Sequence, residues 1–195
     1  MVKKILFISL LTLPIFAAER ASFGLNINNS DLEVEGRSSL ANQLNSLMYR
    51  NYYIDGNFIK SDDDNLFGVG FYVENSPQGH SNLTFGIGLR SIFSSNDKLD
   101  KKFVAIPIQI NAKARMYLGN LPKSSLGVKL AYAPSPLTFS DGDSYFEYRV
   151  EVDMNVIQNI DLYIGYRNID TDYNSKKYNL NDSVYAGFKF TLDPR

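Results

Sequence analysis

Hydrophobic and polar residues alternate along much of this 195-residue chain, and the longest such stretch spans residues 104–118. Every second residue in the stretch is apolar, whereas the residues between them include Gln109, Lys113 and Arg115. A period of two predicts a β-strand, because successive side chains of a strand point to opposite faces. The stretch exceeds the roughly 5–6 residues of a common soluble strand and reaches the roughly 9–11 residues that a strand needs to cross a bilayer. It therefore predicts a membrane-spanning strand with an apolar face toward lipid and a polar face toward a lumen.

The same alternation recurs along the chain, and each repeat has one apolar face free of charge. The alternating segments are residues 22–28, 32–36, 52–58, 67–74, 83–90, 104–118, 126–132, 145–156, 160–167 and 184–192. Between the first two, Asn28 to Asp31 change the parity with residue types that favour a turn. The series predicts an all-β fold, namely a transmembrane antiparallel up-and-down barrel of about ten strands, or about eight if the first hairpin lies elsewhere.

A soluble β-sandwich or a lipocalin-like barrel would show the same alternation with the two faces exchanged. The polar faces of this chain are rich in glycine and tyrosine and carry clustered opposite charges, as a narrow wet lumen requires. This composition favours the membrane barrel. Pro107 is unexpected in a central strand because it cannot donate to the ladder, so we expect a bulge or a missing hydrogen bond there.

The first 18 residues have the organisation of a secretory signal peptide. Lys3 and Lys4 precede an apolar run over residues 5–16, and the small residues Ala17 and Ala18 follow as alternative cleavage points. We therefore expect a signal peptide over residues 1–18 and a barrel over residues 19–195. Between Ser38 and Arg50, leucines at helical spacing predict one short amphipathic helix packed under the barrel.

Connection lengths suggest an orientation, since barrels of this class have short periplasmic turns and longer external loops. With the last strand ending in the periplasm, we expect residues 61–65, 93–102, 135–144 and 168–182 to be external connections. Residues 37–51, 75–81, 119–124 and 157–159 then become periplasmic connections. The outer ones are longer in most of these pairs, although residues 37–51 and 61–65 are exceptions.

Composition excludes several classes of function. The chain has no cysteine and a single histidine, His80, so thiol chemistry and sites built from several histidines are not available. A formal net charge of -1 gives no basic field for nucleic acid. His80 falls in an expected turn without a base–orienter pair, and the glycine pairs in the strands lack the helix of a nucleotide loop. We expect no enzymatic activity, no cofactor and no metal.

Charged residues on the polar faces form the main candidate site. The expected lumen network consists of Lys113, Arg115, Lys129, Glu147, Arg149, Glu151, Asp153, Asp161 and Arg167. Neighbouring strands lie about 4.8 Å apart, so these side chains can pair across strands. They form either a structural network that plugs the interior or the constriction of a small channel. Barrels of about eight strands are filled by their side chains, which favours plugging. Loop acids at residues 62–64, 141 and 143 match no complete calcium loop.

Three segments resemble a known family. They are residues 132–153, residues 162–170 with the sequence LYIGYRNID, and residues 184–190 with the sequence VYAGFKF. They are similar to the YfaZ family of Gram-negative outer-membrane proteins, in the version found in Campylobacter and its relatives. The resemblance implies a barrel in the cell outer membrane. We expect a structural or surface-interaction role, with outer-membrane lipid, lipopolysaccharide and the barrel assembly machinery as partners; a small charged-lumen pore or transporter is the alternative. The oligomeric state stays open.

Overall fold

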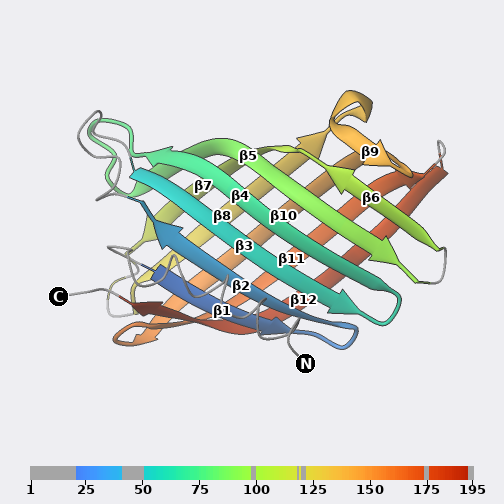
Figure 1. The fold of residues 1–195 in the computed structure, drawn as a ribbon. Helices are drawn as coiled ribbons and strands as arrows, with labels where there is room; N and C mark the ends of the chain where they lie inside the picture. Colours follow the sequence, from blue (N-terminus) through green and yellow to red (C-terminus); the bar gives the residue numbers. More distant parts are fainter. Residues whose placement is uncertain are drawn as a thin grey trace.

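The computed structural model describes residues 21–40, 51–97, 100–117, 119, 122–173 and 176–192. Its wall consists of ten antiparallel strands, each paired with its neighbours along the chain, and β1 pairs with β12 to close the barrel (Figure 1). The wall strands are β1 (Ala21–Ile27), β2 (Asp31–Ser39), β3 (Asn51–Ser61), β4 (Asp64–Asn75), β5 (Leu83–Asn96), β7 (Ile108–Met116), β8 (Ser124–Ala133), β10 (Gly142–Ile157), β11 (Ile160–Tyr173) and β12 (Lys176–Leu192). The all-β up-and-down barrel is confirmed.

The first hairpin belongs to the wall, which confirms ten strands rather than eight. The backbone N–H groups of Ser30 and Asp31 both donate to Asn28 Oδ1 at 2.7 Å, and this side chain forms the turn where the parity changes. β1 then lies between β2 and β12, with Phe23 opposite Phe190 on the β12 side.

Apolar side chains cover the outside of the barrel. On β5, the exposed fractions of Phe85, Ile87 and Leu89 are 51%, 57% and 57%, whereas Arg90 on the opposite face is 2% exposed. The same arrangement recurs on the other wall strands, where phenylalanine, isoleucine, leucine and valine side chains face outward. A soluble barrel would place these side chains inside. The outward apolar surface therefore belongs to lipid, and the fold is a transmembrane barrel.

Pro107 divides the stretch from which the fold was predicted. The part before it is β6 (Lys101–Ala105) and the part after it is β7. Pro107 has no N–H, but its carbonyl accepts a hydrogen bond from the backbone N–H of Arg90 at 3.0 Å, so the chain keeps its direction beside β5. The N–H of Ile106 donates to Leu137 O at 2.8 Å. The expected interruption is confirmed. On the side away from β5, β6 pairs with the short β9 (Thr138–Ser140), whereas β7 pairs with β8.

The connections at one end of the barrel are shorter than the sequence suggested. β11 continues to Tyr173 and β12 begins at Lys176, so most of the expected 168–182 loop is an extended hairpin. Likewise, residues 135–144 contain the 3-10 turn η1 (Ser135–Leu137), β9 and the start of β10. The pairing of β11 with β12 shifts register between Ile169 and Asp170, and mostly polar residues continue both strands beyond this point. We call the end of the barrel where β11 turns into β12 the hairpin end. The opposite end, near Ala21 and Leu192, is the terminal end (Figure 1).

Two expected segments fall outside the described residues. They are the signal peptide over residues 1–18 and residues 41–50 of the expected helix. Ser38 and Ser39 are the last residues of β2 and pair with Ile54 and Tyr53 of β3, so a helix does not begin there. No helix within the described ranges is long and apolar enough to cross a membrane.

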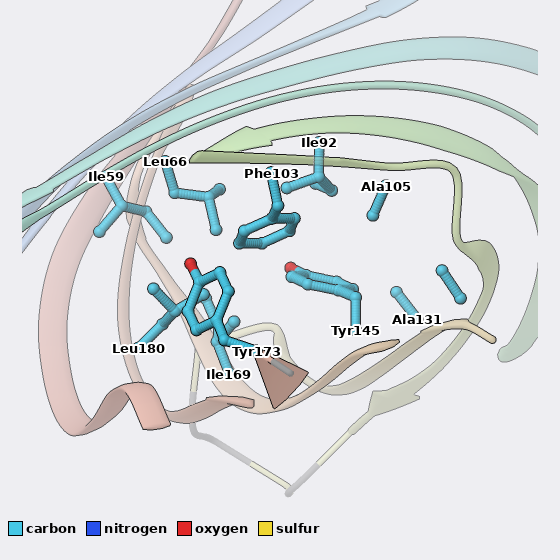
Figure 2. Packing of buried hydrophobic residues seen from close by; sticks show 11 residues of the cluster. Ile59, Leu66, Ile92, Phe103, Ala105, Ala131, Tyr145, Ile169, Tyr173 and Leu180 are labelled. Carbon is cyan, nitrogen blue, oxygen red and sulfur yellow. The ribbon is translucent and has the colours of Figure 1, made fainter. Parts of the chain in front are cut away.

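The interior toward the hairpin end is apolar, although the sequence suggested a polar lumen throughout. Phe103 is 1% exposed and its ring lies 5.9 Å from that of Tyr173 and 6.0 Å from that of Tyr145, measured between centroids (Figure 2). We call this cluster the apolar plug. It comprises Ile59, Leu66, Ile92, Phe103, Ala105, Ala131, Ala133, Tyr145, Ile169, Tyr173 and Leu180. Its side chains come from both halves of the chain and fill the cross-section that they share.

Gly88 tests the close approach of β4 and β5. A Cβ at this position would lie 2.2 Å from Phe71 O and 2.3 Å from Tyr72 Cβ. We expect Gly88→Ala to destabilise the barrel by about 1–3 kcal/mol, the usual cost of overpacking. Gly36→Ala is the matched control, because no atom lies within 4 Å of a Cβ there. The measurement is the temperature at which the compact electrophoretic form of the unheated protein is lost. Equal temperatures for both variants would contradict this packing.

Candidate functional site

A buried carboxylate lies at the centre of the lumen. Glu33 on β2 has 0% of its surface exposed. Arg149 of β10 binds both of its oxygens, with Nη1 2.9 Å from Oε2 and Nη2 3.0 Å from Oε1. Arg167 of β11 donates to Oε2 as well, and Asn26 and Asn57 donate side-chain N–H groups at 2.9 and 2.5 Å. Four strands besides β2 thus meet at one side chain.

The network continues on both sides of the two arginines. Arg167 Nη2 lies 2.6 Å from Asp31 Oδ1, and Arg167 Nε donates to Asn181 Oδ1 at 2.9 Å. Arg149 Nε donates to Glu147 Oε1 at 3.1 Å. Glu147 also accepts from the Tyr145 hydroxyl at 2.7 Å, which joins the network to the apolar plug. These groups satisfy one another's hydrogen-bonding capacity in a region where water is excluded.

A third arginine extends the network across β3 and β5. Arg90 donates to Asn57 Oδ1 and, through Nη1, to Gln109 Oε1 at 3.2 Å. The same Nη1 lies 3.4 Å from Asp55 Oδ1, and Lys129 Nζ lies 3.7 Å from Asp55 Oδ2. We call the whole set the belt. It consists of Asp31, Glu33, Asp55, Asn57, Arg90, Lys129, Glu147, Arg149 and Arg167.

A second cluster lies closer to the terminal end. Lys189 Nζ is 3.0 Å from Glu151 Oε1 and 3.4 Å from Asp153 Oδ1, while Lys113 Nζ is 3.0 Å from Asp153 Oδ2. Nearby, Arg37 pairs with Glu74 at 2.7 Å, and its guanidinium carbon lies 3.9 Å from the ring centroid of Tyr53. These pairs retain partial contact with solvent, because the exposed fraction of the Arg37 side chain is 36% and that of Lys113 is 44%.

The structure brings together most of the predicted lumen residues. Lys113, Lys129, Glu147, Arg149, Glu151, Asp153 and Arg167 all form ion pairs inside the barrel. Two residues lie at the terminal rim instead. Arg115 Nη1 lies 3.4 Å from Ser81 O, and Asp161 Oδ1 accepts from Asn155 Nδ2 at 2.7 Å. Arg115 lies opposite Ser125, which carries no charge, and Asp161 lies opposite Lys189, whose ammonium pairs with Glu151 and Asp153 instead.

Sequence reasoning missed the central carboxylate and several of its partners. Asp31, Glu33, Asp55, Arg90 and Lys189 all take part in the ion pairs. The signal was present, because Glu33 alternates with the outward Leu32 and Val34 and therefore belongs to the inner face. What the sequence lacks is the distance across the lumen. Glu33 and Arg167 lie on strands that are not adjacent, and their side chains meet only because the barrel closes between β1 and β12.

Two adjoining cavities lie toward the terminal end. The outer one has a volume of about 540 Å³ and the inner one about 190 Å³. Both are lined by Ser22, Arg37, Glu74, Lys113, Asp153 and Lys189. The inner cavity ends against Asn57, Arg90 and Arg149 of the belt. We call the two cavities together the vestibule. Beyond its floor, the belt and the apolar plug occupy the lumen.

The other candidates have local partners. Asp141 accepts from the backbone N–H of Lys102 at 3.1 Å, and this bond lowers the pKa of the Asp141 carboxyl. Asp64 accepts from Asn96 at 2.7 Å. His80 is exposed in the β4–β5 connection, with Nδ1 3.3 Å from Gln78 O. Within the described ranges, histidine, aspartate and glutamate do not gather in a group that could hold a metal ion.

Comparison with known proteins gives a family and a set of similar barrels. A family model described as "YfaZ precursor" matches residues 2–192. No curated protein sequence matches the chain. The chain is similar to a structure titled bacterial polysaccharide outer membrane secretin, with 13% identity, a TM-score of 0.47 and coverage of 90% of this chain and 69% of that one. The chain is also similar to the NanC porin, with 13% identity, a TM-score of 0.47 and coverage of 88% of this chain and 98% of that one. For the KdgM porin the identity is 9% and the TM-score 0.42, with coverage of 88% of this chain and 98% of that one. At these values the likenesses do not bear on what this barrel binds.

Glu33→Gln tests whether the belt depends on one carboxylate. The amide keeps the shape but leaves two buried arginines short of a negative charge. Breaking such a buried pair typically costs about 3–5 kcal/mol. We expect a matching loss in the free energy of unfolding, measured by urea titration of the lipid-reconstituted protein. Glu35→Gln is the control, because Glu35 is 22% exposed and lies 3.6 Å from its partner Lys189. A Glu33 variant as stable as the Glu35 variant would overturn the central role of Glu33.

Proposed function

We propose that this chain, which belongs to the YfaZ family, is a closed outer-membrane barrel that acts through its surface and not as an open pore. The observation that carries the proposal is the filled lumen. Glu33 and Arg167 have side chains that are 0% exposed, and the apolar plug lies on their hairpin side. Barrels with an apolar exterior of this kind are proteins of the bacterial outer membrane. A role that needs solute flow through this lumen would require both layers to move.

The hairpin end offers a surface for an external partner. Lys176, Lys177 and Asn179 are exposed on the projecting β11–β12 hairpin, and Lys177 Nζ lies 3.0 Å from Asp170 Oδ2. We propose that this end faces outward and that its lysines contact the phosphates of lipopolysaccharide. Lipid covers the wall, and the assembly machinery would act on the β1–β12 seam, where Phe190 of the last strand faces outward at 39% exposure. An enzymatic role is not part of the proposal.

A small pore is the second candidate, and the vestibule favours it. A water-accessible space of about 540 Å³ already opens at the terminal end and narrows toward charged groups. Opening the barrel would then require only the belt and the plug to rearrange. The two candidates differ in whether the resting protein conducts ions.

Planar-bilayer recording separates the closed barrel from the pore. We expect the reconstituted protein to give no conductance steps, because buried ion pairs and packed rings occupy the lumen. Arg149→Ala with Arg167→Ala removes two large belt side chains, and a variant that still folds should conduct or leak more than the parent. Folding is checked by the mobility difference between heated and unheated samples. Regular steps from the parent protein, changed in ion selectivity by Glu151→Lys, would favour the pore.

Lipopolysaccharide binding tests the proposed outer surface. Replacing both Lys176 and Lys177 with serine should weaken binding about threefold to tenfold, since each exposed lysine contributes modestly and the effect is screened by salt. Lys176→Arg with Lys177→Arg, which keeps both positive charges, is the matched control and should bind like the parent. Binding is measured on the folded protein in detergent at low and high salt. A loss that is equal in the two variants would contradict the assignment of the hairpin end.

A further inference from the structure

At the floor of the vestibule, two cations share one carboxylate across long separations. Asp55 is the carboxylate there, and it is shared by Arg90 at 3.4 Å and Lys129 at 3.7 Å. Other carboxylates of the lumen have much closer partners, such as 3.0 Å between Glu151 and Lys189. Arg90 also donates to Asn57 and Gln109, so Lys129 is the cation left with a single long pair.

Lys129 is the group with donors to spare. Its ammonium carries three N–H donors. In the described part of the chain its one ion pair is the 3.7 Å contact with Asp55, which is longer than a hydrogen bond, and Glu147 attracts it from a greater distance. Its side chain is 20% exposed, and Lys129 lines the inner cavity. Arg149, which also lines this cavity, is already bound to Glu33 and Glu147. The unused donors of Lys129 are thus available to an acceptor that enters the vestibule.

The mouth of the vestibule favours an anion. Its lining carries five cationic side chains, Arg37, Lys113, Arg115, Lys123 and Lys189, against three acidic ones, Glu74, Asp153 and Asp161. A cleft lined by an excess of one sign concentrates ligands of the opposite sign. Arg115 and Asp161, which stand outside the ion pairs of the lumen, are both at this mouth.

The wall beside Lys129 leaves room for a ligand. Gly127 lies two residues before Lys129 on the inner face of β8 and lines the inner cavity. A Cβ at Gly127 would meet only Glu151 O, at 3.9 Å, which is an ordinary contact. A larger side chain there would enter the cavity without displacing the wall. The inner cavity, at about 190 Å³, has space for a phosphate group with its nearest substituent.

We propose that the vestibule binds a phosphate group, with Lys129 at the floor as the principal cation and the basic mouth as the entrance. A phosphate presents several anionic oxygens. It can therefore accept hydrogen bonds from both Lys129 and Arg90 while Asp55 remains in place. The same chemistry is offered by a free phosphate ester and by the headgroup of a phospholipid at the terminal end. This site does not depend on whether the barrel conducts.

Phosphorus NMR of the detergent-solubilised full chain tests the proposal with defined probes. The probes are inorganic phosphate, glycerol 3-phosphate and short-chain phosphatidylglycerol, each at low ionic strength with chloride-matched controls. We expect line broadening that saturates, and affinity about tenfold weaker in Lys129→Gln and in Gly127→Leu. Lys60→Gln and Gly36→Leu are the matched controls. Lys60 is exposed on β3 away from the vestibule, and a side chain at position 36 would face outward like that of its pairing partner Phe23, so both variants should bind like the parent.

Each outcome decides the proposal. Binding of the water-soluble probes assigns a soluble ester, and binding of the lipid alone assigns a headgroup; both support the site if the Lys129 and Gly127 variants lose it. No saturable broadening, or equal binding by these variants and their controls, overturns it. Retained heat-modifiable migration shows that a loss of binding is not a loss of folding. Conductance in bilayers would overturn the closed barrel and leave this result untouched.

Discussion

The burial of Glu33 is the constraint on which the lumen depends. Removing a carboxylate from water is costly unless it is paired and fully hydrogen-bonded. Two arginines and two asparagines provide these partners, and they come from β1, β3, β10 and β11. β1 and β3 flank β2 near the start of the chain, whereas β10 and β11 come more than 100 residues later, so the carboxylate is satisfied only when the whole barrel has closed. The pairing therefore couples barrel closure to the filling of its interior, and an incompletely closed barrel would leave charges without partners.

The apolar plug and the belt reinforce each other. The plug keeps water away from the hairpin side of the belt, and electrostatic attraction is stronger where water is absent. Tyr145 joins the two layers, because its ring packs near Phe103 while its hydroxyl binds Glu147 (Figure 2). An ordinary soluble domain places its apolar core behind polar walls. Here lipid surrounds the apolar exterior, so the interior can hold charge and still needs an apolar layer to exclude water from one side.

The sequence predicts the wall better than it predicts the interior. A strict period of two identifies the lipid-facing residues without any knowledge of neighbours, so the ten strands, their faces and the break at Pro107 could be predicted. The lengths of the outer connections could not, because strands that leave the membrane no longer need apolar outward residues. Ile59, Leu66 and Ile169 in the plug were missed for a related reason. Each lies on the inner face of its strand in regular alternation, as Ile59 does opposite Leu66, but a single sequence does not show where along the lumen the inward residues change from polar to apolar.

The distribution of charge along the lumen explains why one end is filled and the other is open. Near the middle, carboxylates and guanidinium groups meet at short distances and exclude water, so this region resembles a packed core built from polar groups. Toward the terminal end, lysines on flexible stems join Arg37 and Arg115, and the pairs are partly exposed, as for Lys113 and Asp153. Arginine favours rigid, multidentate pairing, whereas lysine is a hydrated point charge. The larger share of lysine toward the terminal end therefore accompanies the passage from a structural seal to a surface that remains available to solvent and to anions.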